Sequence, residues 1–214
     1  MPGKISRELI AKMILSGINK AHKDYEEWSG GDWLWNAPEY LLTTYIARSI
    51  ADIDCTKYIT LENSASDAIK DAGAFTRGRL SHKARPNGRI DILLWWGAKC
   101  SPRAVIEVKH NVYSYAQLRH DVDRIENILV KNQANSSLQF GALAFYIVSE
   151  DSKQSPMKTA SKRIRTILDN IEEAAKDDLS ESFQVKLFTK LHEEEDSAWT
   201  AACLMLIPKR SYSG

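Results

Sequence analysis

The sequence predicts a single α/β domain, because segments with the period of a helix alternate along the chain with segments typical of strands. Its 214 residues are 43% hydrophobic and 27% charged, which provides enough apolar material for one sizeable core. No linker, internal repeat or low-complexity stretch divides residues 1–214. These observations favour one α/β domain over a fibrous, repetitive or disordered chain.

Two helices are expected before the first strand. Apolar residues recur at helical spacing over residues 6–28, with Ser6 as the N-cap, so an N-terminal helix is expected there. After a loop rich in Gly and Trp, similar spacing predicts a helix over residues 38–52, with Asn36 as a candidate cap and Pro38 in the first turn. We expect the loop tryptophans to pack against the core, although such rings could also stack on bases. They are Trp28, Trp33 and Trp35.

A β-hairpin is the most informative feature of the sequence. Residues 88–96 and 104–110 are rich in β-branched and aromatic side chains, and turn residues lie between them. This pattern predicts two antiparallel strands, with the turn centred near Lys99. The pairs expected directly opposite each other are Asp91 with Glu107, Arg89 with Lys109, and Leu93 with Val105.

The remaining segments continue the alternation of helices and strands. One of them, residues 138–149, is too apolar for an exposed edge of the sheet. Residues 151–214 are expected to form a C-terminal helix-strand-strand extension. We expect strands over residues 57–62, 138–149, 183–192 and 198–207, a short helix over residues 66–71, and longer helices over residues 113–131 and 156–176.

The charges of the chain are segregated, although their sum is only +1. Residues 77–109 contain eight basic and two acidic side chains, and such a segment is expected to attract a polyanion. Residues 169–196 contain ten acidic and three basic side chains, which we interpret as solvated surface. The chain has no apolar stretch of the roughly 18 residues that a membrane helix needs and no signal-peptide pattern, so a cytoplasmic location is expected.

Asp91 and Glu107 are expected to form a site for a divalent cation. Side chains alternate along a strand, so Glu107 and Lys109 share one face, and directly opposed Cβ atoms lie ~4.5–5.5 Å apart. Two carboxylates at that distance repel each other unless a cation or a proton lies between them, and Mg²⁺, for which Mn²⁺ can substitute, fits there. Lys109 could then hold or polarise an attacking water. The alternative is a set of surface ion pairs worth ~0.2–1 kcal/mol.

Asp91 and the run Glu107-Val108-Lys109 interrupt strands that are otherwise apolar, within a predicted order of helix, strand, strand, strand, helix, strand. In this respect the sequence resembles the PD-(D/E)xK nuclease superfamily, over residues 36–150. The resemblance implies a restriction-endonuclease-like αβββαβ core, with a mixed central sheet flanked by helices. One departure is visible, since Ile90 stands where the superfamily motif has its proline.

The resemblance also implies roles for individual residues. Asp91, Glu107 and the carbonyl of Val108 would hold Mg²⁺, while Lys109 orients the nucleophile or stabilises the transition state. Many members carry a glutamate on the first core helix, and Glu39 stands at that position. It would contact the ion through water or bind a second ion. The apolar residues on its helix face favour that role, whereas the alternative is an acid stabilised by the helix dipole.

Three further residues are candidates for contacts with nucleic acid. Arg85 and Arg89 lead directly into the first acidic strand, and guanidinium groups suit phosphate oxygens. Gln117 follows the lysine strand on the next helix, where members of the superfamily often carry a glutamine that positions substrate. On the same helix, Asp121 and Arg124 are three residues apart and are expected to form an ordinary intrahelical ion pair.

The expected function is Mg²⁺-dependent hydrolysis of phosphodiester bonds in nucleic acid by a metal-activated water, with DNA as the expected substrate. The alternative is a catalytically silent module that binds nucleic acid or joins a larger assembly on the same scaffold. A homodimer would suit the cleavage of duplex DNA. No sequence motif for nucleotide binding or for a zinc site is present.

Overall fold

A six-stranded mixed sheet forms the centre of the protein, which the computed structural model describes over residues 5–54, 57–74, 82–97, 99–131, 133–150, 159–179 and 181–209. The strand order is β1-β2-β3-β4-β6-β5. β3 and β4 are parallel, and all other neighbours in this sheet are antiparallel. The strands are β1 (Lys57–Ser64), β2 (Arg89–Trp96), β3 (Ser101–His110), β4 (Phe140–Glu150), β5 (Phe183–Glu193) and β6 (Ser197–Pro208).

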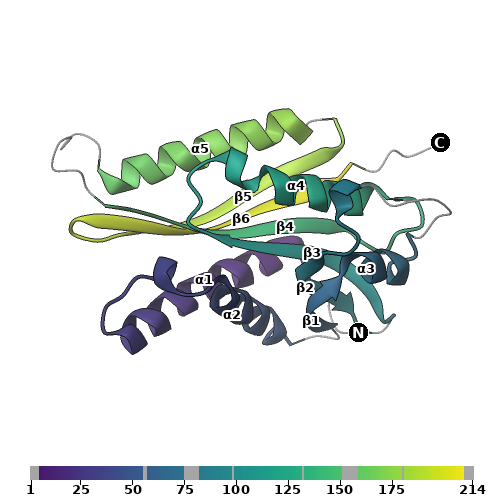
Figure 1. The fold of residues 1–214 in the computed structure, drawn as a ribbon, viewed down its shortest axis with the longest axis horizontal. Coiled ribbons are helices and arrows are strands. Elements are labelled where there is room, and N and C mark those ends of the chain that lie inside the picture. The colour runs from purple at the N-terminus through teal and green to yellow at the C-terminus, as the bar shows by residue number, and fades with distance from the viewer. Residues whose placement is uncertain are drawn as a thin grey trace.

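Within the described ranges, five α-helices pack around the sheet. As Figure 1 shows, α1 and α2 lie on one face, and α4 and α5 lie on the other. Each face buries its own apolar cluster, and α3 contributes to the cluster under α4 and α5. The helices are α1 (Arg7–Ser29), α2 (Glu39–Ala51), α3 (Ala65–Asp71), α4 (Tyr115–Val130) and α5 (Ala160–Leu179).

The ends of the first two helices follow from local chemistry. α1 begins after Ser6, whose side chain accepts a hydrogen bond from the Leu9 backbone N–H, and ends at Gly30, whose φ of 75° is strained for other residues. Asn36 does not cap α2, so that expectation is wrong. It lies in a 3₁₀ turn, and Pro38 occupies the N-cap position without a side-chain hydrogen bond.

Helix α4 lies very close to β4 because a glycine faces it. A Cβ atom placed on Gly141 would stand 2.1 Å from Cγ2 of Ile125, so any side chain at this position would push the helix away. β4 itself lies between β3 and β6 and is buried along most of its length, as its apolar sequence predicts. This contact sets the distance between α4 and the strands that carry the candidate site.

The structure confirms the α/β class and one of the three strand pairs predicted for the hairpin, while the ladder between β2 and β3 ends before the expected pairs of Asp91 with Glu107 and Arg89 with Lys109. Leu93 pairs with Val105 as expected, although the register shifts between Leu94 and Trp95, and β3 begins at Ser101. The C-terminal strands extend the sheet, since β6 pairs with β4 and β5 with β6. The start of the predicted helix over residues 156–176 lies partly outside the described residues. In the described part of the chain, no helix is long and apolar enough to cross a membrane.

Candidate active site

Asp91 lies where β2 and β3 separate. Pairing between these strands ends at Ile92 and Ile106, so the next residues do not follow the regular ladder. The Asp91 side chain replaces one of the missing ladder hydrogen bonds: its Oδ2 accepts a hydrogen bond from the Val108 backbone N–H at 2.7 Å. On the other side, pairing of β1 with β2 is interrupted at Glu62, which has a φ of 55°. Asp91 is thus held between two strands at an irregular point in the sheet.

Glu107 is buried beside Asp91. The side chain of Glu107 is 4% exposed, and the two carboxyl groups are close enough for a hydrogen bond between them to contribute to both pKa values. Burial raises the pKa of Glu107 well above its usual range, and the charges of Asp91 and Asp121 add to that rise while Arg124 opposes it. Burial also raises the pKa of Asp91, against the effect of the hydrogen bond from Val108. Asp91 and Glu107 do not form surface ion pairs, which argues against the alternative in which the charged residues of the hairpin only pair with one another on an exposed face.

Lys109 extends from β3 toward carboxylates on two helices. Its Nζ lies 3.7 Å from Oε1 of Glu39 and 3.7 Å from Oδ2 of Asp121. Burial lowers the pKa of Lys109, but the neighbouring carboxylates outweigh this effect and leave its pKa above the ordinary value. Lys109 is therefore a charged donor whose position is fixed from both faces of the sheet.

Glu39 contributes to the site from the first turn of α2. Its side chain meets the sheet at Lys109 on β3, on the side expected, but it is 38% exposed and therefore only partly buried. His110 lies beside it, with Nδ1 3.9 Å from Oε2 of Glu39, while the opposite ring nitrogen, Nε2, donates to the Ala37 carbonyl at 3.0 Å. This pair of contacts ties the end of β3 to the start of α2.

Asp121 and Arg124 belong to the site and do not form the expected intrahelical pair. Asp121 contacts Lys109, and Arg124 Nη1 lies 2.9 Å from Oε1 of Glu107. Both α4 side chains are buried. A signal for Asp121 was present in the sequence, because its spacing from Leu118 and Ile125 places an acid on the apolar face of the helix.

The three candidate nucleic-acid contacts differ in their surroundings. Arg85 is half exposed, and its Nη1 lies 3.9 Å from Oδ1 of Asp121, so it borders the acidic site. Arg89 is exposed at the start of β2. Gln117 turns back onto its own helix, where its Oε1 accepts hydrogen bonds from the backbone N–H groups of Tyr113 and Ser114. This capping role accounts for Gln117 without substrate, and its contact with nucleic acid stays a prediction.

The oxygen atoms around Asp91 and Glu107 suit a hard divalent cation. In the described residues no three His, Cys, Asp or Glu side chains are grouped as a complete metal site. Mg²⁺ does not need such a group, because it is commonly bound by one or two carboxylates and keeps several waters. Oε1 of Glu107 is buried without a hydrogen-bond partner among these residues, although Nη1 of Arg124 lies 2.9 Å from it, so this oxygen keeps acceptor capacity beside a guanidinium group. The two carboxylates therefore fit Mg²⁺, and the carbonyl of Val108 remains a predicted third ligand.

No family model, curated protein or solved structure matches this chain in comparisons with known proteins.

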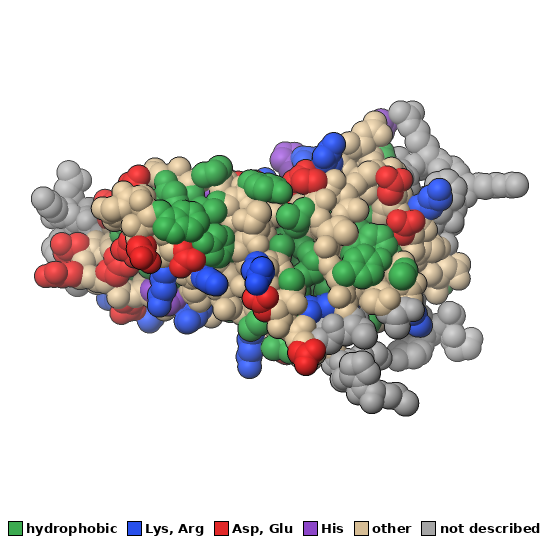
Figure 2. Space-filling model, turned by 90° about the horizontal axis from the view of Figure 1, so that it is seen from below, with side chains coloured by type: hydrophobic (Ala, Val, Ile, Leu, Met, Phe, Trp, Pro, Cys, Tyr) green, Lys and Arg blue, Asp and Glu red, His purple; other side chains and the backbone are tan. Residues whose placement is uncertain are grey.

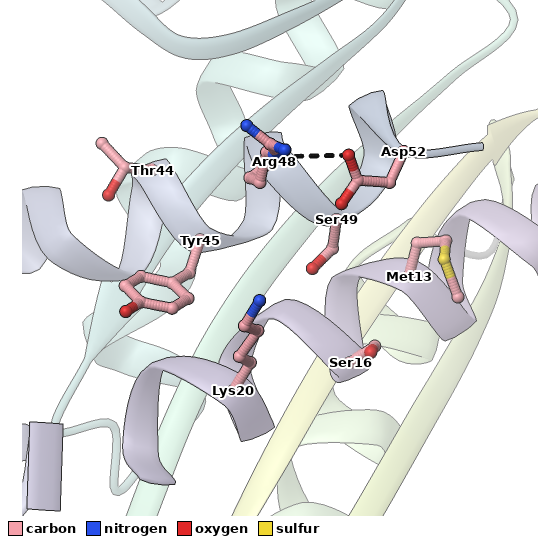
Figure 3. A pocket seen from close by; sticks show the side chains of 8 residues that line it. All are labelled: Met13, Ser16, Lys20, Thr44, Tyr45, Arg48, Ser49 and Asp52. Carbon is pink, nitrogen blue, oxygen red and sulfur yellow. Dashed lines mark hydrogen bonds and ion pairs between the residues drawn. The ribbon is translucent and has the colours of Figure 1, made fainter. Parts of the chain in front are cut away.

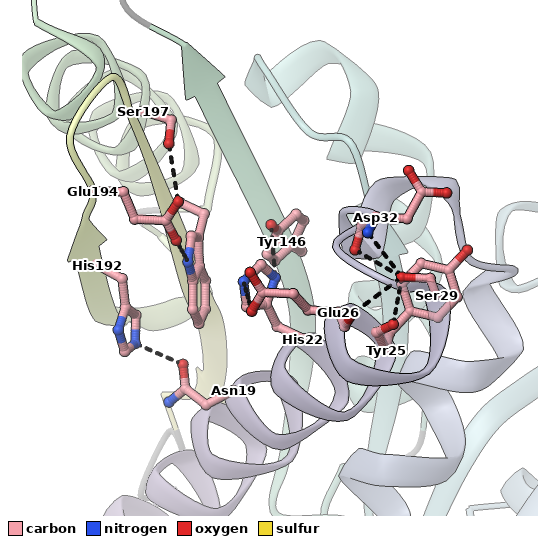
Figure 4. Close-up of polar contacts among 11 residues, drawn as sticks. Asn19, His22, Tyr25, Glu26, Ser29, Asp32, Tyr146, His192, Glu194 and Ser197 are labelled. Carbon is pink, nitrogen blue, oxygen red and sulfur yellow. Dashed lines mark hydrogen bonds and ion pairs between the residues drawn. The ribbon is translucent and has the colours of Figure 1, made fainter.

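A second polar cluster lies between α1 and the ends of β5 and β6 (Figure 4). The Trp199 ring is sandwiched between His22 and His192, each with its ring centroid 3.9 Å away. Burial lowers the pKa of His22 to about 4, so this side chain is neutral at pH 7, and Tyr146 contacts its Nδ1 at 3.2 Å. Trp33 packs edge-on against His22, as expected for a core residue. We interpret this cluster as packing that joins α1 to the sheet.

The outer surface of α1 and α2 carries a shallow pocket of about 590 Å³ between the two helices (Figure 3). Lys20 points into it from α1, and Arg48 pairs with Asp52 at 3.0 Å along its rim. Seen from this side, apolar side chains form separate patches among the charged ones (Figure 2), and Trp28 is 61% exposed. The expectation that all three loop tryptophans pack into the core is therefore wrong for Trp28.

Proposed function

We propose that this chain is a divalent-metal-dependent nuclease of the PD-(D/E)xK superfamily, with DNA as its substrate. The order α2, β1, β2, β3, α4, β4 supports this proposal, because it matches the αβββαβ order that the sequence resemblance implies once α3 and a 3₁₀ turn, which lie between β1 and β2, are taken as an insertion. The mixed sheet with helices on both faces is also compatible with a restriction-endonuclease-like core.

The observation that carries the proposal is the close approach of Asp91 and Glu107 at the point where β2 and β3 separate. Lys109 follows Glu107 by two residues on β3. Burying two carboxylates together is unfavourable unless a cation or a proton compensates for their charge. A protein that needed only a stable sheet would gain more from apolar residues at these positions. The energetic cost is therefore best explained by a chemical role.

The side chains around the carboxylates suit phosphodiester hydrolysis. A bound Mg²⁺ would supply Lewis acidity and neutralise negative charge on the phosphate. Lys109 is placed to orient the attacking water and to stabilise the charge that develops on phosphorus oxygens. Glu39 and Asp121 hold the Lys109 ammonium group in position, and Arg85 at the border of the site can contact a neighbouring phosphate.

Cleavage assays on the purified chain test this proposal. Plasmid and linear DNA are incubated with Mg²⁺, Mn²⁺ or EDTA, and Asp91→Ala and Lys109→Ala are compared with Asp52→Ala, a control that alters the exposed acid capping the C-terminus of α2. We expect metal-dependent cleavage that falls by at least about 10²-fold in either site variant and is unchanged in the control. Full activity in either site variant would contradict the assignment.

The same assay distinguishes the alternative function. A non-catalytic module would bind DNA with a steep salt dependence and would not cut it under any metal condition. Binding without cleavage would therefore replace the nuclease proposal with an assembly role.

A further inference from the structure

Arg124 is a buried cation that forms an ion pair with one carboxylate among the described residues, that of Glu107. Its side chain is 5% exposed, and that of Glu107 is 4% exposed, so neither charge is substantially compensated by solvent. Nη1 of Arg124 lies 2.9 Å from Oε1 of Glu107, yet the orientation does not make a hydrogen bond. Nε and Nη2 of Arg124 are also buried without hydrogen-bond partners among the described residues. The contact is thus electrostatic and leaves hydrogen-bonding capacity unused on both side chains.

The backbone makes room for this guanidinium group. A Cβ atom placed on Gly88 would stand 3.1 Å from Nη2 of Arg124, which is closer than most real contacts. Gly88 lies directly before β2, the strand of Asp91, so a glycine there lets Arg124 pass close to the chain. On the opposite side, the contact of Ile125 with Gly141 fixes the next residue of α4 against β4. Arg124 therefore occupies a defined place between α4 and the acidic strands.

The neighbouring cations cannot replace Arg124. Lys109 is engaged by Glu39 and Asp121, and Arg85 approaches Asp121 from the surface at 3.9 Å. Glu107 has no other cationic partner within ion-pair distance among the described residues. Without Arg124, the buried Glu107 carboxylate would face mainly the like charges of Asp91 and Asp121.

From this arrangement we propose that Arg124 is a positioning residue, which holds the Glu107 carboxylate in the orientation that a divalent cation requires. This inference rests on the proposed function, because it assumes that Asp91 and Glu107 bind a metal ion. Residues that contact metal ligands without touching the metal fix the orientation of those ligands, and loss of such a residue typically weakens metal binding about 10- to 100-fold. A guanidinium group also repels a cation, but we expect loss of ligand orientation to outweigh the relief of that repulsion.

Binding of Mn²⁺ alone, measured by the electron paramagnetic resonance signal of the free ion, tests the proposal without DNA cleavage. The variants are Arg124→Met, which removes the charge, and Arg124→Lys, which keeps the charge but lacks the planar fork. Arg119→Met and Arg119→Lys are matched controls, because Arg119 lies on the same helix and pairs with Asp178 on the surface. Circular dichroism and thermal unfolding of each variant report whether it is folded.

We expect the dissociation constant for Mn²⁺ to rise about 10- to 100-fold in Arg124→Met and by a smaller factor in Arg124→Lys, with no change in either Arg119 variant. In cleavage assays, the Mg²⁺ concentration for half-maximal rate should rise in parallel, while KM for DNA stays the same. If Arg124→Met does not fold, the comparison rests on Arg124→Lys, which should still bind Mn²⁺ more weakly than the wild type.

Two results would overturn the inference in distinguishable ways. Folded Arg124 variants that bind Mn²⁺ as tightly as the wild type, or that are less stable with an unchanged dissociation constant, would show that Arg124 has only a structural role. In that case, loss of cleavage in Asp91→Ala would leave the nuclease proposal standing. A wild-type chain that neither binds Mn²⁺ nor cleaves DNA would overturn the proposed function, and this inference with it.

Discussion

The substitution Asp91→Asn should separate the stability of the protein from its activity. Asparagine keeps an oxygen that can accept the hydrogen bond from Val108, so the local geometry is retained while the charge is lost. Burial raises the pKa of Asp91, which means that folding disfavours its charged form. Removing the charge should therefore stabilise the metal-free protein and raise its Tm.

The effect of pH follows from the same shift. The folded protein binds a proton at Asp91 more readily than the unfolded chain, so the cost of the charge is present at neutral pH and disappears as the pH falls toward the ordinary value of 3.8. The stability difference between Asp91→Asn and the wild type should consequently shrink as the medium is acidified. Urea denaturation of both proteins from pH 7 to pH 4, in EDTA, measures this difference.

Addition of Mg²⁺ should reverse the order of stability. At a concentration of 100 times the dissociation constant, a ligand that binds only the folded state adds about 2.7 kcal/mol, and this gain should be absent from Asp91→Asn. Asp52→Asn is the matched control, since it also neutralises one acid, but Asp52 is the exposed residue that caps the C-terminus of α2. If Asp91→Asn were stabilised by Mg²⁺ as much as the wild type, the assignment of Asp91 as a metal ligand would be wrong.

Two further predictions concern the scaffold. Gly141→Val should destabilise the protein by about 1–3 kcal/mol in urea denaturation, because its side chain would collide with Ile125, and a normal stability would contradict the close packing of α4 on β4. Burial lowers the pKa of His22 from 6.5 to about 4, so protonation opposes folding and the wild type should lose about 3 kcal/mol of stability through His22 as pH falls from 6.5 to 4. His22→Phe should lose less over this range, and an equal loss would refute a buried neutral histidine.

The hairpin shows how far local sequence rules reach. Alternating apolar residues and a turn near Lys99 were sufficient to predict that Leu93 pairs with Val105 and that Asp91 approaches Glu107. The shift after Leu94 was not predictable, because a bulge depends on how the strands twist against their neighbours rather than on residue type alone. The register was therefore predicted at Leu93 and Val105, and missed both near the turn and beyond Ile92, where the expected pair of Arg89 with Lys109 does not form.

The other contacts in the site depend on how the helices pack against β3, which cannot be read from the sequence. Asp121 and Arg124 have a plausible partner in each other at helical spacing, so the local interpretation hid the contacts that each makes with β3. Glu39 was expected on the face of α2 that packs on the sheet, and it does meet β3 through Lys109, but in the first turn of the helix its side chain stays partly exposed. In each case, tertiary packing decided which of two reasonable partners the side chain met.

The ion pair between Arg124 and Glu107 has a consequence for how the chain matures. Small zinc domains remain unfolded until their metal arrives, because nothing else compensates for their clustered ligands. Here the guanidinium group of Arg124 compensates part of the charge of Glu107 as soon as α4 packs on the sheet. We therefore expect a newly synthesised chain to fold even where divalent ions are scarce. For the nuclease proposed above, the metal-free chain would then be folded but inactive until Mg²⁺ binds.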